Sequence, residues 1–504
     1  MGVEQLHSTA DVPQLIDGGL ITNLMHLIWL SRKDLQIAFD ISTKKGQEGF
    51  LAWYQVSVMR EYGIRPEVAQ QRESIMRTES AIRNFGKRLP APIRKLGKEL
   101  WMRLLARAAR NVARNADLLG KSAKHELGAA KTTGADGMPG ANLIGYAHAE
   151  LGMGEHVRMT AAALDATDVT FCVLNFDVGV PSRKLASLDH GEITTDNEYS
   201  VNVFHINADQ MLAAYCHLGH GFFANRYNIG YWAWELSKCP EASVPVIEMV
   251  DEIWAPSRFI QAAFSEKTGK PVEYMPLCVT LQPFQVRRRI EFGLPENHFL
   301  FLFAFDFFSY VERKNPFAVI RAFQVAFPDR SSRVGLVIKV MNGDLKSTQW
   351  RRMMNLIDND KRIHIINKTM SRSDVLALID SCDSFVSLHR SEGFGRGPAE
   401  AMLLGKPVIV TNYSGNTDFT RPDNSCLVDY RLIPVETGQY VFEDGQVWAD
   451  PDVEHAAWHM RRLVANPAAA AEIGLRGKEF ISANFNQSVI GRIYARRLKD
   501  IMGC

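Results

Sequence analysis

Two glutamates that bracket a glycine-rich turn are the residues of this chain best suited to chemistry. Glu392 and Glu400 lie eight positions apart, with the turn 393–395 between them. The apolar run 383–388 before the turn indicates a buried strand, and Pro398 suits the first turn of a following helix, because its missing N–H would be unpaired there. Open α/β sheets bind ligands where a strand ends before a helix N-terminus. Two carboxylates and several backbone donors at such a place suit a polyhydroxylated ligand such as a nucleotide sugar.

The same stretch resembles the donor-site motif of retaining glycosyltransferase family 4, whose members are GT-B glycosyltransferases. The resemblance rests on Glu392-x7-Glu400 around Gly-Phe-Gly, on Ala401-Met402 and on Gly405-x-Pro407-Val408-Ile409. It implies that Glu392 contacts the donor hexose and that Glu400 accepts hydrogen bonds from the ribose hydroxyls. The turn residues that it implies for donor binding are Gly393, Phe394 and Gly395.

A second group of candidates is cationic. Departure of a nucleotide diphosphate leaves negative charge that must be stabilised, and a fold without a metal needs cations and helix N-termini for this task. Arg313 and Lys314 precede Pro316, which suits the start of a helix. They resemble the two diphosphate-binding cations of the family: Lys314 matches the family lysine, whereas Ser309 stands where the arginine is usual. We therefore expect Arg313 to substitute, although an exposed surface pair is the ordinary alternative.

The first half of the chain offers candidates at its own strand ends. Gly152 and Gly154 follow an expected strand at 142–146 and would let the backbone approach a donor phosphate closely. His205 and Asn207 end a later strand and are predicted on the acceptor side, although a lone histidine there is more often structural.

Trp234 and Glu235 occupy the place where many family members have a catalytic-site histidine. We expect Glu235 to orient an acceptor hydroxyl and Trp234 to lie beside a sugar. The resemblance assigns two further residues to the donor. Ser414 belongs to a loop for which a plain turn is an equal alternative, and Asn367 belongs to the segment 366–369, where backbone groups are expected to meet the nucleobase.

Two patterns that could hold a metal are interpreted as coincidental. Asp358-Asn359-Asp360 follows an expected helix and precedes two cations, which indicates a turn. Cys216-His217-x2-His220 has ligand-type spacing, but a second cluster that would complete a zinc site is missing. We expect no metal and no cofactor, with a GDP- or UDP-linked sugar as co-substrate.

The elements that must position these residues alternate between strand and helix. Residues 141–284 and 285–485 are predicted to form two doubly wound, Rossmann-like domains that face a cleft, the first on the acceptor side and the second on the donor side. This α/β architecture is the GT-B fold that the resemblance implies. Residues 1–127 are predicted as a mostly helical extension, 128–140 as a linker, and 486–504 as a C-terminal helix that in the family crosses back to the first domain.

Charge and cysteine usage bear on the location of the protein. The net charge of +2 hides a basic segment at 83–124, which has twelve Lys or Arg against Glu99 and Asp117. Its apolar residues recur at helical spacing, so it is predicted as an amphipathic helix that lies either on an anionic membrane surface or on the protein itself. Base-stacking aromatics are missing, so nucleic acid is not expected as a partner.

Seven scattered cysteines without pairing motifs favour a reducing compartment. We find no signal-peptide pattern, and the apolar runs are too short to span a membrane. We therefore expect a cytoplasmic protein, either soluble or peripheral at the inner face of the cytoplasmic membrane.

The resemblance implies a retaining, metal-independent transferase. It would move a hexose of the mannose or glucose type from a nucleotide diphosphate to a glycan or lipid-linked glycan during polysaccharide or lipopolysaccharide biosynthesis. A phosphorylase-like or epimerase-like sugar enzyme on the same fold is one alternative, and a non-catalytic GT-B scaffold is another. The presence of Glu392, Glu400 and Lys314 argues against the scaffold.

Overall fold

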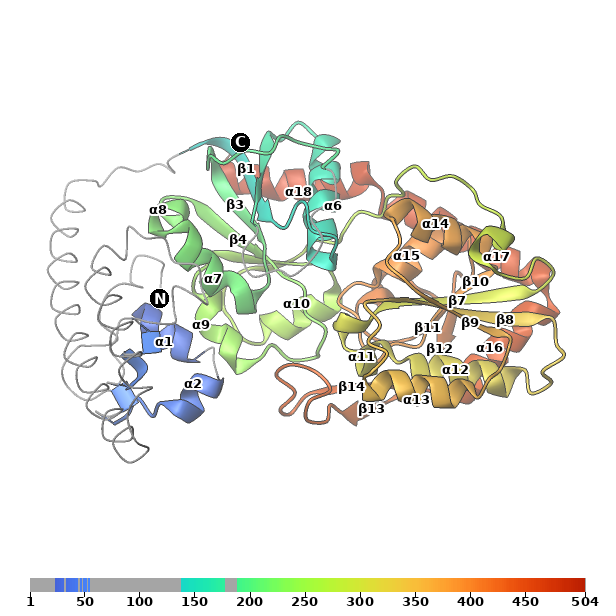
Figure 1. Ribbon diagram of the computed structural model, residues 1–504. Coiled ribbons are helices and arrows are strands. Elements are labelled where there is room, and N and C mark those ends of the chain that lie inside the picture. Colours follow the sequence, from blue (N-terminus) through green and yellow to red (C-terminus); the bar gives the residue numbers. More distant parts are fainter. Residues whose placement is uncertain are drawn as a thin grey trace, which may run out of the picture.

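The computed structural model describes residues 23–54, apart from 31–32, 44–45, 48 and 52, and residues 137–176 and 188–503. This part of the chain contains two α/β domains side by side, each built on a six-stranded parallel sheet with helices on both faces (Figure 1). The architecture is GT-B.

The first sheet has the strand order β2-β1-β3-β4-β5-β6. Its strands are β1 (Met138–Gly145), β2 (Phe171–Asn175), β3 (Tyr199–His205), β4 (Tyr227–Tyr231), β5 (Glu252–Ala255) and β6 (Val272–Tyr274). Its helices are α6 (Gly152–Asp165), α7 (Ala208–Leu218), α8 (His220–Phe223), η3 (Glu241–Ser243), α9 (Val244–Ile247) and α10 (Arg258–Ser265). Because the order reverses between β1 and β3, the loops that follow these strands open a crevice at the carboxyl edge.

The second sheet has the order β12-β11-β10-β7-β8-β9. Its strands are β7 (Phe299–Asp306), β8 (Val334–Met341), β9 (Ile363–Asn367), β10 (Ser384–Ser387), β11 (Val408–Thr411) and β12 (Cys426–Val428). Its helices are η4 (Arg289–Phe292), η5 (Phe307–Ser309), α11 (Val311–Lys314), α12 (Pro316–Ala326), α13 (Thr348–Ile357), α14 (Arg372–Ser381), α15 (Arg396–Leu403), η6 (Gly415–Asp418), α16 (Val453–Ala465) and α17 (Pro467–Asn484). The switch point here lies between β7 and β10, so α11 and α15 begin at the same crevice.

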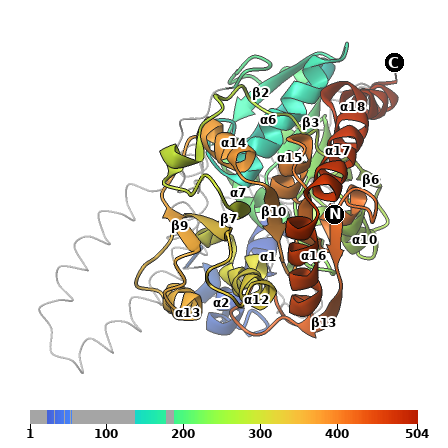
Figure 2. The same cartoon turned by 90° about the vertical axis from the view of Figure 1, so that its right-hand side faces the viewer.

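Three further elements join the domains. A hairpin of β13 (Tyr430–Pro434) and β14 (Val447–Pro451) leaves the second domain, and α18 (Gln487–Met502) returns from α17 to pack on α6 of the first domain. Figure 2 shows α16, α17 and α18 following one another along one side of the molecule. The hydroxyl of Tyr494 on α18 donates to the Pro276 carbonyl at 2.6 Å, in the segment that leads from one domain to the other.

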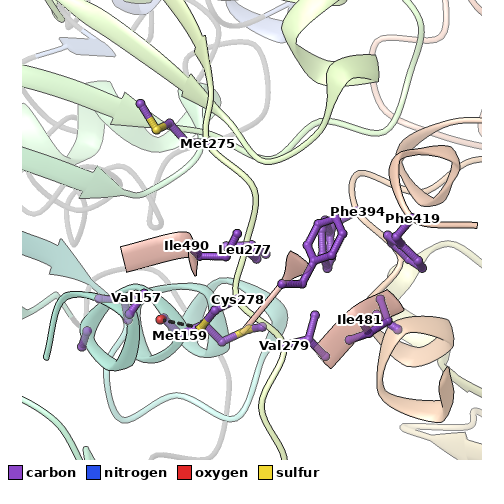
Figure 3. Packing of buried hydrophobic residues seen from close by; sticks show 14 of the residues in the cluster. Val157, Met159, Met275, Leu277, Cys278, Val279, Phe394, Phe419, Ile481 and Ile490 are labelled. Atoms are coloured by element: carbon purple, nitrogen blue, oxygen red, sulfur yellow. Dashed lines mark hydrogen bonds between the residues drawn. The ribbon is translucent and has the colours of Figure 1, made fainter. Parts of the chain in front are cut away.

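That connecting segment also carries a core shared by both domains. Figure 3 shows Cys278 beside Met159 of α6, while Phe394 and Phe419 of the second domain lie nearby. The thiol of Cys278 donates to the Met159 carbonyl at 3.0 Å. Apolar burial therefore continues across the boundary between the domains and fixes their relative positions.

Two boundaries differ from those expected from the sequence. β1 begins at Met138, inside the range 128–140 expected for the linker, because Met138 pairs with Tyr199 of β3 before a bulge. α6 begins at Gly152 rather than at Glu155, so the glycine segment forms the first helical turn instead of a loop before it. The N–H groups of a first turn have no helical partner, so glycine weakens the helix little there.

The N-terminal residues that the structure describes pack on the first domain. α1 (Asn23–Leu30) and α2 (Lys33–Ala38) contribute Ile28 and Leu35 to its core, together with Phe50. The basic segment 83–124 lies outside the described residues, so the helix expected there stays a prediction. Among the described helices, none has the length and apolar character needed to span a membrane.

Candidate active site

The turn after β10 lies against the loop after β4 of the other domain. Ser257, which caps α10, donates its hydroxyl to the Gly393 carbonyl at 2.6 Å. A Cβ added at Gly393 would lie 3.1 Å from the carbonyl oxygen of Trp234. The carboxyl edges of the two sheets therefore meet at this point, with Glu392 on one side and Glu235 on the other.

The carboxylate of Glu392 is held between two cations from α11. Lys314 Nζ binds one oxygen, and Arg313 Nη1 binds the other at 3.2 Å while also donating to the Ser391 carbonyl at 3.0 Å. Burial alone would raise the pKa of Glu392, but Lys314 and Arg313 outweigh burial and hold the pKa at about 2. Glu392 is therefore ionised at neutral pH.

The two cations differ in how firmly they hold their charge. Burial opposes the charge on Arg313, but Glu392 and Glu235 outweigh it and raise its pKa. Burial lowers the pKa of Lys314, and Glu392 only partly opposes this. Ser309, where the family arginine is usual, lies in η5, and the arginine that contacts Glu392 is Arg313. The site thus combines a permanent guanidinium with an ammonium whose charge depends on the neighbouring carboxylate.

Two bends in the backbone after β7 position Arg313 and Lys314. Tyr310 (φ 61°) and Asn315 (φ 56°) both adopt left-handed conformations, so α11 is a single turn between two bends. The Asn315 side chain caps α12 by accepting from the Ala318 N–H at 3.3 Å, and it donates to the Leu388 carbonyl at 3.0 Å. This asparagine therefore ties α11 to the end of β10, next to Glu392.

The turn itself is fixed by close backbone contacts. Gly395 (φ 98°) caps α15 in a conformation that glycine adopts without strain. The Ser414 hydroxyl accepts from the Glu392 N–H at 2.8 Å, and the Gly415 N–H donates to the Glu392 carbonyl at 2.9 Å. A Cβ at Gly415 would collide with the Gly393 carbonyl. Ser414 and Gly415 thus hold Glu392 in place through its backbone.

Phe394, which was assigned to the donor, points elsewhere. Its side chain is buried beside that of Phe419 (Figure 3), with 5.3 Å between the two ring centres. The centre of its ring also lies 6.1 Å from that of Phe485. It therefore anchors the turn in the core shared by the domains, and only its backbone can face a ligand.

Glu400 is the centre of an ion network that crosses between the domains. Arg372 binds its carboxylate, and Arg396 Nε lies 3.3 Å from it. Arg396 also lies 3.8 Å from Glu155, in the first turn of α6. Burial would raise the pKa of Glu155, but Arg396 and Arg158 reverse this and hold it at about 2. Glu155 is therefore ionised at neutral pH, and Arg396 links it to Glu400 of the other domain.

Glu235 is held from the second domain. The hydroxyl of Tyr440, in the β13–β14 hairpin, donates to one carboxylate oxygen, and Arg313 Nη2 lies 3.8 Å from the other. The neighbouring Trp234 donates its indole N–H to the Lys238 carbonyl at 3.0 Å. Glu235 and Glu392 thus share Arg313, which places a carboxylate from each domain at one guanidinium.

This geometry accompanies a match to a known family. Residues 289–480 match the family model described as "Glycosyl transferases group 1". Residues 289–480 thus carry a group 1 glycosyltransferase domain. No protein of curated function matches its sequence significantly.

Solved structures with the same fold are distant in sequence from this glycosyltransferase. A sucrose-phosphate synthase from Thermosynechococcus elongatus is 16% identical, with a TM-score of 0.53 over 72% of this chain and 99% of that one. HepE from Anabaena, solved in complex with UDP-glucose, is 14% identical, with a TM-score of 0.53 over 71% of this chain and 99% of that one. A glycosyltransferase from Rickettsia africae is 14% identical, with a TM-score of 0.51 over 72% and 98%. At these identities the likeness establishes the fold alone.

The remaining acceptor-side predictions for this glycosyltransferase lie at the strand ends of its first domain. His205 is fully buried, and its Nδ1 lies 2.8 Å from Nδ1 of His156 on α6. Burial lowers the pKa of both rings, that of His156 to about 3, so the pair is neutral and links β3 to α6. Asn207 accepts from the Ala233 N–H at 3.0 Å, which ties the loop after β3 to the segment before Glu235.

The other donor predictions are spread more widely. Gly154 packs its backbone against the Ala149 carbonyl, while a side chain at Gly152 would meet open space. Asn367 ends β9, at the edge of the second sheet, and donates to the Gly343 carbonyl at 3.4 Å. The contacts that the structure gives Asn367 do not join it to the group around Glu392.

The two sequence patterns that could hold a metal, at 358–360 and 216–220, contact other protein groups. Asp358 and Asn359 adopt left-handed turn conformations, and the carboxylate of Asp360 binds Arg362. His220 Nδ1 lies 3.3 Å from the hydroxyl of Tyr215. Within the described ranges, no three His, Cys, Asp or Glu side chains gather as metal ligands would.

Sequence reasoning missed four residues that the fold brings to the site. Arg396 stands inside the glutamate motif, and Glu155 follows the two glycines directly, so both had a positional signal. Arg372 and Tyr440 had none, because each lies far along the chain from its partner and meets it only through the folded topology. The missed residues are Glu155, Arg372, Arg396 and Tyr440.

Proposed function

We propose that this glycosyltransferase is a retaining enzyme that transfers a hexose from a UDP- or GDP-linked donor to a glycan or lipid-linked glycan. Glu392 contacts the hexose, Arg313 and Lys314 bind the diphosphate, and Glu400 binds the ribose. Transfer proceeds without a metal. The observation that carries the proposal is the ionised Glu392, held by the buried Arg313 and the half-buried Lys314 just before α15.

Arg313 and Lys314 supply what a departing diphosphate needs. They are fixed before any donor arrives, so little reorganisation is required when negative charge develops on the leaving group. Glu392 can accept bonds from donor hydroxyls, and its negative charge stabilises the positive charge that develops on the sugar as the glycosidic bond breaks. The fold relative HepE, whose structures contain UDP and UDP-glucose, supports a nucleotide sugar as donor and makes UDP the first candidate.

In the proposed reaction, the acceptor hydroxyl attacks the anomeric carbon on the face from which the diphosphate leaves. The bond from the anomeric carbon to the diphosphate oxygen breaks, and the bond to the acceptor oxygen forms. The hydroxyl proton passes to the departing diphosphate oxygen, so no protein base is required. Glu235, at the opposite wall, accepts a hydrogen bond from an acceptor hydroxyl and orients it.

Calorimetric titration with UDP, GDP, ADP and CMP, repeated in EDTA, tests donor binding. We expect micromolar affinity for UDP or GDP that EDTA does not change. Absence of binding by all four nucleotides would contradict the proposal, and loss of binding in EDTA would contradict metal independence. The anomer first released during slow hydrolysis of UDP-glucose, followed by proton NMR, tests retention: α-glucose supports it and β-glucose contradicts it.

A further inference from the structure

The β13–β14 hairpin is fastened to the first domain beside the site. Gln446 accepts from the Lys238 N–H at 3.2 Å and donates to the Lys238 carbonyl at 2.7 Å. Leu236 of the first domain shares a small buried cluster with Tyr440 and Trp448 of the hairpin. Figure 1 shows the hairpin loop extending from the second domain towards the first. The hairpin is therefore held against the first domain and forms a wall beside Glu235.

Aromatic rings from three segments meet at this wall. The ring centre of Tyr440 lies 4.5 Å from that of Tyr310 and 6.0 Å from that of Trp234. The ring centre of Phe442 lies 6.4 Å from that of Trp234. Tyr310 remains 37% exposed, and Phe308, two residues earlier, is 71% exposed. The rings thus gather around the Tyr440–Glu235 hydrogen bond, while Tyr310 and Phe308 keep much of their surface exposed.

Two of these aromatic residues adopt an unfavourable backbone conformation. Tyr310 has φ 61° and Phe442 has φ 53°, in the left-handed region that bulky side chains rarely adopt. Such backbone strain persists where the surrounding structure enforces it, and it concentrates at functional sites. Two aromatic residues with left-handed backbones therefore stand in one ring cluster.

The chemistry of this wall matches one face of a sugar. A pyranose ring has an apolar face of C–H groups and a rim of hydroxyls. Aromatic rings cover the apolar face, and a carboxylate accepts from the rim. Glu235 shares Arg313 with Glu392, so a sugar hydroxyl bound to Glu235 would lie on the acceptor side of the transfer site.

We propose that Tyr310 and Phe442 form a platform on which a pyranose ring of the acceptor packs, with a hydroxyl of that ring bound to Glu235. Tyr440 is a positioning residue, because it acts by holding Glu235. This inference rests on the proposed function, since it assigns the acceptor side of the same transfer site.

Saturation-transfer NMR with methyl α-glucoside, methyl α-mannoside and methyl β-galactoside, in the presence of UDP, tests the platform. We expect transfer to the ring C–H protons of at least one glycoside in the wild-type protein. The effect should fall by about fivefold or more in Phe442→Gly and Tyr310→Ala and persist in Phe442→Tyr. Trp458→Ala, which removes an exposed ring on α16, is the matched control and should change nothing.

Phe442→Gly separates binding from folding. Glycine adopts φ 53° without strain, so this variant should be at least as stable as the wild type while it loses the glycoside signal. Glycoside signals that are absent from the wild type, or unchanged in Phe442→Gly, would overturn the platform. The nucleotide titration is independent of this result: UDP binding without glycoside binding rejects the platform alone, whereas failure of all nucleotides rejects the proposed function.

Discussion

At the scale of single residues, the site consists of opposite charges that neutralise one another until a donor arrives. Glu392 stands between Arg313 and Lys314, and Glu400 stands between Arg372 and Arg396. In the proposed reaction, a diphosphate and a ribose would exchange partners with these groups. Removing Glu392 would also leave the buried Arg313 with less compensating charge, so a test of this residue needs a control for folding.

Glu392→Gln should lower turnover by about 100-fold or more, because the amide cannot balance the charge that develops on the sugar. The rate of UDP release from UDP-glucose measures this. Glu312→Gln is the matched control, since Glu312 lies two residues before Lys314 but pairs with Arg352 and Arg390. Equal losses in the two variants would show that Glu392 acts only in folding.

The histidine pair predicts a specific acid sensitivity. His156 has a pKa of about 3 in the folded protein, whereas an unfolded histidine has a pKa near 6.5. Below about pH 6.5 the unfolded state therefore binds more protons than the folded state, and the free energy of unfolding decreases as the pH is lowered. The free energy of unfolding should decrease by up to about 1.4 kcal/mol per pH unit for each histidine. Melting temperatures between about pH 7 and pH 5 should fall less steeply in His156→Gln than in the wild type. Parallel curves would contradict the assignment.

At the scale of elements, most of what positions the site was predictable. The apolar runs before Glu392 and before Arg313 are continuous because parallel strands are buried on both faces, and Pro316 and Gly405 marked the ends of helices. The hairpin was not predicted, because β13 is largely exposed and its stability comes from the other domain rather than from its own pattern. The buried pairing of His205 with His156 could not be found either, since it joins residues far apart in the chain.

Gly415→Ala should test how strictly the turns position the site. A Cβ at Gly415 collides with the Gly393 carbonyl, so the turn that carries Glu392 must shift. Displacement of a catalytic group by about 1 Å can cost about 100-fold in rate, so we expect turnover to fall by about 10- to 100-fold. Gly221→Ala on α8, where a Cβ meets open space, is the control. Wild-type turnover in Gly415→Ala would show that the turn tolerates movement.

At the scale of the whole molecule, α18 decides whether the two domains form one body. It starts in the second domain and ends on the first, where Tyr494 reaches the Pro276 carbonyl and Arg497 binds Glu252. The basic segment 83–124 concerns a second contact, either with an anionic membrane surface or with the protein itself, which stays a prediction from the sequence alone. The first of these contacts acts together with the shared core and the hairpin to hold the carboxylates of the two domains at Arg313.

Two ion pairs of α18 allow this to be tested within one helix. Arg497 binds Glu252, whose side chain is completely buried and also accepts from Tyr227 at 3.0 Å, whereas Lys499 binds Asp168, which is 74% exposed. Arg497→Ala leaves a buried charge without its cation, which costs about 3 kcal/mol or more. Lys499→Ala removes a surface pair worth about 1 kcal/mol at most.

Calorimetric melting of the two variants distinguishes these cases. Arg497→Ala should lower the melting temperature of the first domain and reduce turnover, because the two domains are held less firmly. Lys499→Ala should leave the melting profile nearly unchanged. Equal effects of the two substitutions would mean that α18 is held by its apolar face alone, and that the docking of the domains does not depend on Glu252.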